Sequence, residues 1–131
     1  GMGDALVELK KTWHLAIVTS KPEPQALIAI QATGVRHYFD IVVGPHDDSE
    51  IPKAQLLERA LREMKELHGE LPPLTSCWMI GDRHHDIDAG VEVGTHCAGV
   101  LWGFGSREEL SSAGATAIVE TPQELVVVLN N

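Results

Sequence analysis

The chain has few of the features that would indicate a membrane-bound or nucleic-acid-binding protein. No apolar run approaches the roughly 20 residues that cross a bilayer, and no signal-peptide pattern opens the sequence. Basic residues are scarce, since 10 Lys and Arg stand against 19 Asp and Glu, for a formal net charge of −9. Because such a surface lacks the positive charge that neutralises phosphates, we expect no nucleic-acid partner and no membrane partner.

Cysteine is also rare, with only Cys77 and Cys97. Both fall in segments predicted as buried strands, so we expect reduced core thiols and no disulfide. Reduced thiols are typical of the cytoplasm, which is the location that we predict. The remaining composition is that of an ordered protein: 44% of the 131 residues are hydrophobic. This length suits one domain with its own core, which we place at residues 1–131.

Short apolar runs alternate with segments of helical periodicity along the chain. Strands are expected at 14–19, 39–44, 76–81, 96–101 and 116–119. Helices are expected at 2–12, 22–33, 52–68 and 84–93, with two more that begin at Ser106 and Thr121. The alternation predicts the α/β class, as a three-layer, Rossmann-like parallel sheet with helices on both faces.

Polar residues follow three of the predicted strands. Thr19 and Ser20 end the first strand, Lys53 begins the helix after the second, and Asp82 and Asp86 follow the third. Because ligands of open parallel sheets bind beyond the carboxyl ends of the strands, these residues are candidates for one site. Hydroxyl and ammonium groups suit a phosphoryl group, and carboxylates suit a hard cation such as Mg²⁺.

Three short motifs also resemble those of a known family. They are Val18-Thr19-Ser20-Lys21-Pro22, Ile51-Pro52-Lys53-Ala54 and Gly81-Asp82-Arg83-His84-His85-Asp86. In that order they are similar to the second, third and fourth motifs of the haloacid dehalogenase (HAD)-like hydrolase superfamily. The run 100–110 and Ala113-Gly114-Ala115 resemble its phosphoglycolate-phosphatase-like branch, so the likeness covers nearly the whole chain.

The resemblance implies hydrolysis of a small phosphomonoester, with a phosphorylated metabolite or inorganic phosphate as the partner. It implies that Thr19, Ser20 and Lys53 bind phosphate and that Lys53 also offsets negative charge during catalysis. It further implies that Asp82 and Asp86 hold Mg²⁺, directly or through water.

The chain departs from this family at one decisive point. The first motif, Asp-x-Asp followed by Gly-Thr or similar, occurs nowhere, and neither does the helical cap. Because that motif carries the nucleophile and two metal ligands, we expect little activity from this chain alone and weak binding of Mg²⁺. A catalytically silent binding or regulatory module, one half of a split phosphatase, and a fragment of a larger phosphatase remain alternatives.

The first motif belongs to a strand that would lie in the middle of the sheet. Without it, we expect the strands to close up in the order second, first, third, fourth, or a homodimer to fill the gap. Unpaired buried strand edges are costly, which is the reason for both expectations.

Structural roles are possible for the same residues. Thr19 and Ser20 could cap the helix that begins at Pro22, and Lys53 could be an ordinary surface lysine. Asp82 and Asp86 could belong to a solvated turn. His84 and His85 are expected at the surface, because adjacent helical side chains point about 100° apart and do not readily share one metal ion. Arg107 and Glu108 are expected to pair where their helix begins.

Overall fold

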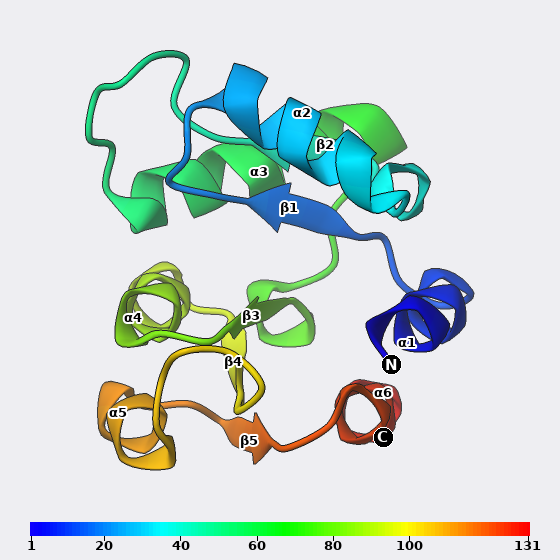
Figure 1. The fold of residues 1–131 in the computed structure, drawn as a ribbon, viewed down its shortest axis with the longest axis vertical. Coiled ribbons are helices and arrows are strands. Elements are labelled where there is room, and N and C mark those ends of the chain that lie inside the picture. The colour runs from blue at the N-terminus through cyan, green and yellow to red at the C-terminus, as the bar shows by residue number, and fades with distance from the viewer. The chain divides into compact units, whose positions relative to one another are not determined.

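The computed structural model describes residues 1–131, which form six α-helices, five β-strands and two short 3-10 helices (Figure 1). The helices are α1 (Met2–Lys10), α2 (Glu23–Thr33), α3 (Lys53–His68), α4 (His84–Val93), α5 (Arg107–Ala113) and α6 (Pro122–Asn130). The strands are β1 (Ala16–Val18), β2 (Ile41–Val43), β3 (Trp78–Gly81), β4 (His96–Val100) and β5 (Ala117–Val119). The chain divides into two compact units, residues 6–71 and residues 1–5 with 72–131.

The unit of residues 6–71 contains a two-stranded parallel sheet and the helices that pack on it. Ala16 pairs with Ile41 and Val18 with Val43, so β1 and β2 run in register. Helix α3 is amphipathic and buries its apolar face, as its periodicity predicts. The core of this unit consists of Val43, Leu56 and Ala60, with Val18, Ile41 and Ile51 packed around it.

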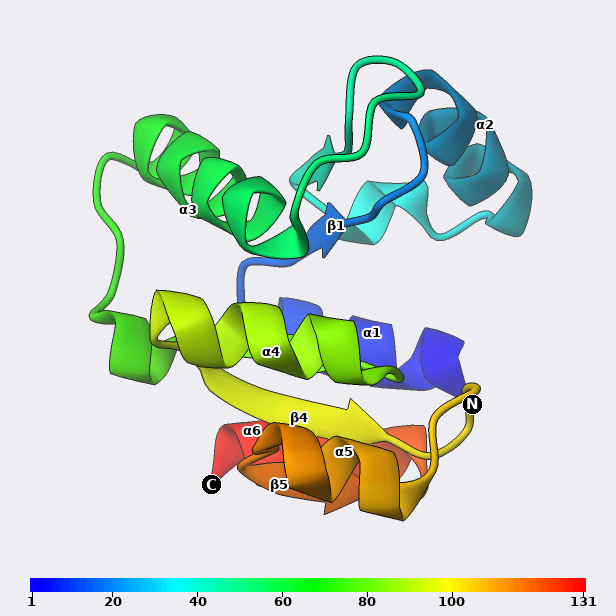
Figure 2. The same cartoon turned by 90° about the vertical axis from the view of Figure 1, so that its left-hand side faces the viewer.

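The unit of residues 72–131 contains a three-stranded parallel sheet in the order β3-β4-β5. Met79 pairs with Cys97, and Ala98 pairs with Ala117. In the view of Figure 2, α4 and α5 lie alongside β4. The most deeply buried side chains of this unit are Ile87, Leu110, Leu125, Val119 and Cys97. Parallel strands flanked by helices confirm the predicted fold class.

The predicted closed order of strands is wrong. β1 pairs only with β2, and β3 pairs only with β4, so no backbone pairing joins the first strand to the third. Direct pairing would add few hydrogen bonds, because β1 has three residues and β3 has four. One edge of each strand therefore has no strand partner. The homodimer and the single cap-free domain stay predictions.

Two smaller expectations are also corrected. Cys77 precedes β3 and is only partly buried, whereas Cys97 is buried; both thiols are free. Arg107 pairs with Glu120, at 3.2 Å between Nη2 and Oε1, and not with Glu108, because the side chain extends toward the end of β5. None of the six helices combines the length and the hydropathy that a membrane-spanning segment needs.

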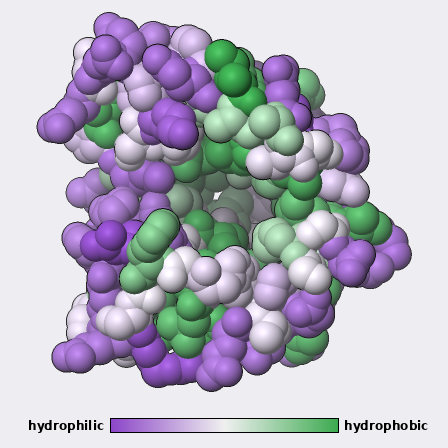
Figure 3. Space-filling view, viewed as in Figure 1, coloured by the Kyte–Doolittle hydropathy of each residue, from purple (hydrophilic) through white to green (hydrophobic).

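Hydrophobic residues are exposed among hydrophilic ones on the face shown in Figure 3. The most exposed large apolar side chains are Phe104, at 91%, and Ile28, at 69%. Phe104 lies in the loop between β4 and α5, and its backbone N–H donates a hydrogen bond to Asp82.

Candidate functional site

Asp86 lies in the first turn of α4, directly after the turn that follows β3. The residue is only 7% exposed and is one of two buried polar or charged residues in the protein. The Arg83 backbone N–H donates a hydrogen bond of 3.4 Å to Asp86 Oδ2. A carboxylate in the first turn also interacts favourably with the helix dipole.

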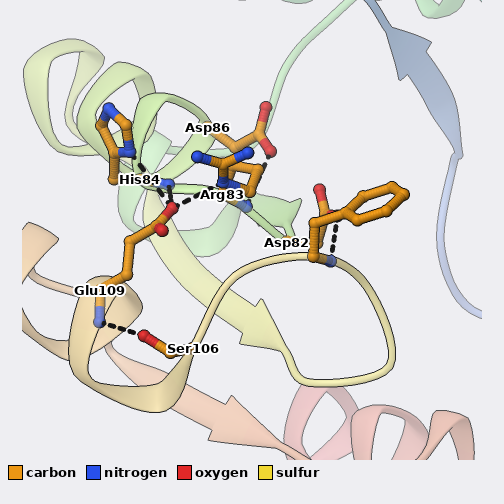
Figure 4. A network of polar contacts seen from close by, with 7 residues as sticks. Asp82, Arg83, His84, Asp86, Ser106 and Glu109 are labelled. Atoms are coloured by element: carbon orange, nitrogen blue, oxygen red, sulfur yellow. Dashed lines mark hydrogen bonds and ion pairs between the residues drawn. The ribbon is translucent and has the colours of Figure 1, made fainter.

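Asp82 is held by the loop between β4 and α5. The Phe104 backbone N–H donates a hydrogen bond of 2.9 Å to Asp82 Oδ2, and Figure 4 shows the Asp82 and Asp86 carboxylates on the same side of the turn. A Cβ on Gly103 would overlap the Asp82 side chain, and one on Gly105 would overlap the Asp82 carbonyl oxygen. The two glycines therefore allow the loop to lie directly against Asp82.

Glu109 joins the beginnings of α4 and α5. Its Oε2 accepts hydrogen bonds from Arg83 Nε at 2.9 Å and from the His84 backbone N–H at 2.7 Å, and His84 Nδ1 lies 3.2 Å away. The bond from Arg83, followed by that from the His84 backbone, lowers the pKa of Glu109 to about 2. Glu109 is thus ionised, and the Arg83 guanidinium balances its negative charge. The contact also orients the Arg83 side chain (Figure 4).

Only half of a capping box is present at the start of α5. Ser106 Oγ accepts a hydrogen bond of 3.1 Å from the Glu109 backbone N–H, as the Ser-x-x-Glu spacing predicts. The Glu109 side chain, however, turns to Arg83 and His84. His84 and His85 are exposed, as expected.

In the unit of residues 6–71, Thr19 and Ser20 follow β1 and Lys53 begins α3. The Thr19 backbone N–H donates to the Val43 carbonyl at 2.9 Å, which extends the pairing of β1 with β2 by one residue. Thr19 Oγ1 accepts a hydrogen bond of 3.1 Å from the Lys21 N–H. The alternative role as a helix cap is wrong, because α2 is preceded by Pro22 and has no side-chain capping bond.

Arg59 supports the same end of this sheet, although the sequence analysis did not identify it. Its Nη1 donates to the Gly44 carbonyl at 3.0 Å and its Nη2 donates to Glu23 Oε2 at 2.8 Å. Its Nε donates to Glu63 Oε2 at 2.8 Å. These bonds with Glu63 and Glu23 raise the pKa of Arg59. The guanidinium therefore fixes α3 against the end of β2 and the start of α2.

An open cavity of about 550 Å³ lies beside Ser20. It is lined by Ser20, Pro22 and residues 47–52. Its lining includes Asp47, Asp48 and Glu50, and hydrogen bonds from Ser49 lower the pKa of Asp47. Three carboxyl groups repel a phosphate, so this cavity by itself does not suit a phosphorylated ligand.

The predicted site residues thus form two groups. Asp82 and Asp86 lie together beyond β3 in one unit, and Thr19, Ser20 and Lys53 lie beyond β1 and β2 in the other. Each group occupies the carboxyl end of its own parallel strands, where ligands of such sheets bind. That the two groups act on one ligand stays a prediction.

Comparison with known proteins identifies the family. Residues 1–100 match the family model of the haloacid dehalogenase-like hydrolases. The chain belongs to this family. A solved protein from Lactobacillus delbrueckii that is described as a phosphoglycolate phosphatase superposes with a TM-score of 0.79 and 27% identity, over 96% of this chain and 51% of that one. This likeness agrees with the branch that the motifs resemble.

Curated and solved relatives of this HAD-like chain have several activities. Tyrosine-protein kinase PtkA of Mycobacterium tuberculosis is 30% identical over 90% of this chain and 39% of that protein. Pyrophosphatase PpaX of Bacillus cereus is 31% identical over 95% of this chain and 56% of that protein. A predicted phosphatase from Clostridium acetobutylicum superposes with a TM-score of 0.88 and 30% identity, over 99% of this chain and 58% of that one. The chain thus spans about half the length of these relatives.

Proposed function

We propose that this chain provides the phosphate- and metal-binding residues of a HAD phosphatase that hydrolyses a small phosphomonoester. The family match and the similarity to proteins named phosphatase or pyrophosphatase support this class of reaction. The observation that carries the proposal is the buried carboxylate of Asp86 next to Asp82, beyond the carboxyl end of β3.

The residues around the β3–α4 turn fit Mg²⁺. Asp82 and Asp86 offer hard carboxylate oxygens, the donors that Mg²⁺ prefers, and two carboxylates leave room for the waters that it retains. When bound, Mg²⁺ would neutralise charge on the phosphoryl group. The Phe104 N–H fixes one oxygen of Asp82, and the Arg83 N–H fixes one oxygen of Asp86. These bonds orient the carboxylates before any ligand arrives.

The residues beyond β1 and β2 suit the phosphoryl group itself. The Thr19 hydroxyl and the Ser20 backbone N–H would donate hydrogen bonds to phosphoryl oxygens, and the Lys53 ammonium would balance their charge. Phosphoryl transfer depends mainly on such positioning and electrostatic stabilisation. Thr19 Oγ1 already accepts a bond from the Lys21 N–H, which leaves its own proton available to donate.

The chain lacks the motif that carries the nucleophile in this family. No Asp-x-Asp-Gly occurs in the sequence, so hydrolysis through an aspartyl-phosphate needs a carboxylate from another polypeptide segment or chain. We therefore expect the 131-residue protein to bind Mg²⁺ weakly and to turn over little substrate.

The free thiols further favour a cytoplasmic location.

Titration with Mg²⁺, followed by amide chemical shifts, tests the metal-binding part of the proposal. Shifts in the β3–α4 turn are expected for the wild type and should be lost in D82N and D86N. D88N is the matched control, because Asp88 lies exposed on the same helix. Equal shifts in D82N and in the wild type would contradict the assignment of the metal ligands.

Turnover of p-nitrophenyl phosphate tests the reaction. The wild-type chain should remain near background in the presence of Mg²⁺. Turnover well above background that is lost in D82N would support the phosphatase assignment and contradict the expected inactivity. Turnover that D82N and K53M both retain would contradict the proposed site.

A further inference from the structure

Three possible metal ligands meet at the amino ends of β1 and β2. Thr19 and Lys53 lie at the opposite, carboxyl ends of these strands. His14 lies two residues before β1, Asp40 lies one residue before β2, and His68 is the last residue of α3. The Asp40 N–H donates to the Leu15 carbonyl at 2.8 Å, which places the residues before the two strands side by side. Helix α3 follows β2 and runs back toward the amino ends of the strands, so its last turn reaches Asp40.

The distances among these side chains are close to those of a metal site. His68 Nε2 lies 3.0 Å from Asp40 Oδ2, and His14 Nδ1 lies 3.5 Å from the same oxygen. One ligand atom from each residue lies within 4.8 Å of the others. With bonds of about 2.0–2.1 Å, neighbouring ligands of tetrahedral Zn²⁺ are about 3.3 Å apart. The two imidazole rings are stacked, with centroids 3.6 Å apart and planes 20° from parallel. Because each nitrogen lone pair lies in its own ring plane, one ring has to turn about its Cβ–Cγ bond before both nitrogens face the same ion.

We propose that His14, Asp40 and His68 bind one divalent transition-metal ion, of which Zn²⁺ is the best candidate. Two imidazoles and one carboxylate suit Zn²⁺, Co²⁺ or Ni²⁺, whereas Mg²⁺ prefers oxygen ligands only. Three protein ligands leave a fourth position for water. The His14 side chain is 59% exposed, so an ion could reach the site from solvent past this residue.

Lys10 supplies the positive charge at this cluster when no ion is bound. Its Nζ lies 3.0 Å from Asp40 Oδ1, the oxygen that the histidines do not contact. Burial raises the pKa of Asp40, but hydrogen bonds from Lys10 and His68 outweigh it and lower that pKa below its usual value. Because Lys10 contacts the same carboxylate, its ammonium and a metal ion would compete for the charge of Asp40.

A bound ion would join the end of α3 to the segments before β1 and β2. These three segments are far apart in sequence but belong to one unit. The site would thus stabilise the unit that carries Thr19 and Lys53 without contacting them. It is independent of the proposed phosphatase reaction, so the two proposals fail separately.

The direct test uses the untagged 131-residue protein with Co²⁺ and Zn²⁺. Visible absorption should show one tetrahedral Co²⁺ ion per chain, displaced by Zn²⁺ and not by excess Mg²⁺. Calorimetry with Zn²⁺ should show affinity reduced at least about tenfold in H14Q, H68Q and D40N, because each loses one ligand. H37Q is the matched control, since His37 is an exposed histidine of the same unit, and its affinity should equal that of the wild type.

A further variant separates metal binding from simple ion pairing. K10M removes the competing ammonium and should tighten Zn²⁺ binding several-fold while leaving all three ligands in place. Absence of binding by the folded wild type at about 1 mM Zn²⁺, or undiminished binding by the H14Q/H68Q double variant, would overturn the proposal. Weaker binding by K10M would also count against it.

Discussion

Arg83 Nε donates a hydrogen bond of 2.9 Å to Glu109 Oε2, and this contact joins the first turns of α4 and α5. The two residues are 26 positions apart in sequence. The same oxygen accepts the His84 backbone N–H, so one carboxylate satisfies a donor at the start of α4 as well. Glu109 is therefore a positioning residue for the turn that carries Asp82 and Asp86.

Replacement of Glu109 by Gln should lower stability in a pH-dependent way. The pKa of Glu109 is lowered from 4.5 to about 2 in the folded protein. A lowered folded-state pKa gives stability that is present above the unfolded value and lost as the pH falls through the folded value. The difference in Tm between the wild type and E109Q should thus be full above about pH 5 and should disappear toward pH 2.

The comparison needs a glutamate that makes no such contact. Glu108 is exposed and adjacent on α5, so E108Q is the matched control. A Tm difference for E109Q that stays constant from pH 6 to about pH 2 would mean that the Arg83 contact does not hold the carboxylate ionised.

Replacement of Gly103 by Ala should displace the loop from Asp82. The new Cβ would overlap the Asp82 side chain, so the variant should lose about 1–3 kcal/mol of unfolding free energy, the usual cost of forcing extra volume into a packed site. G3A is the control, because a Cβ at Gly3 meets nothing within 4 Å. Urea unfolding measures both variants, and equal stability of G103A and the wild type would refute the close approach.

Truncation of Leu56 should be among the costliest changes in α3. Leu56 is 2% exposed and packs in the core with Val43 and Ala60. L56A should lower the unfolding free energy by about 2–5 kcal/mol through the lost transfer energy and the cavity. L67A removes the same atoms from a side chain that is 57% exposed on the same helix, and it should cost within about 0.5 kcal/mol. Similar losses in chemical denaturation would contradict the orientation of α3.

Replacement of Arg59 by Leu should loosen the contact between α3 and the end of β2. It removes the bonds to the Gly44 carbonyl and to the Glu23 and Glu63 carboxylates. We expect a loss of about 1.5–3 kcal/mol, because partly buried charged acceptors lose their donor. R62L changes an exposed arginine of the same helix and should be nearly neutral in the same unfolding assay. A neutral R59L would show that these bonds do not stabilise the unit.

Local sequence signals predicted the helices and strands well. The bounds of α4, residues 84–93, agree with the expected helix because Gly94 ends it in the left-handed conformation. The division into two sheets could not be predicted in this way, because strand pairing depends on how packed helices position each edge. Glu109 shows the same limit: its backbone role at the α5 cap follows from spacing, but the direction of its side chain depends on Arg83, in another helix.

The single-sided pairing of β1 has a consequence for amide hydrogen exchange. In a parallel strand, successive N–H groups point alternately to the two neighbours, and β1 has a neighbour only in β2. Alternate amides of β1 should therefore be protected from solvent deuterium by their bonds to β2, while the amides between them, which have no strand partner, should exchange faster. Neighbouring amides of the apolar sequence Ala-Ile-Val would then differ in exchange rate, although they belong to one strand.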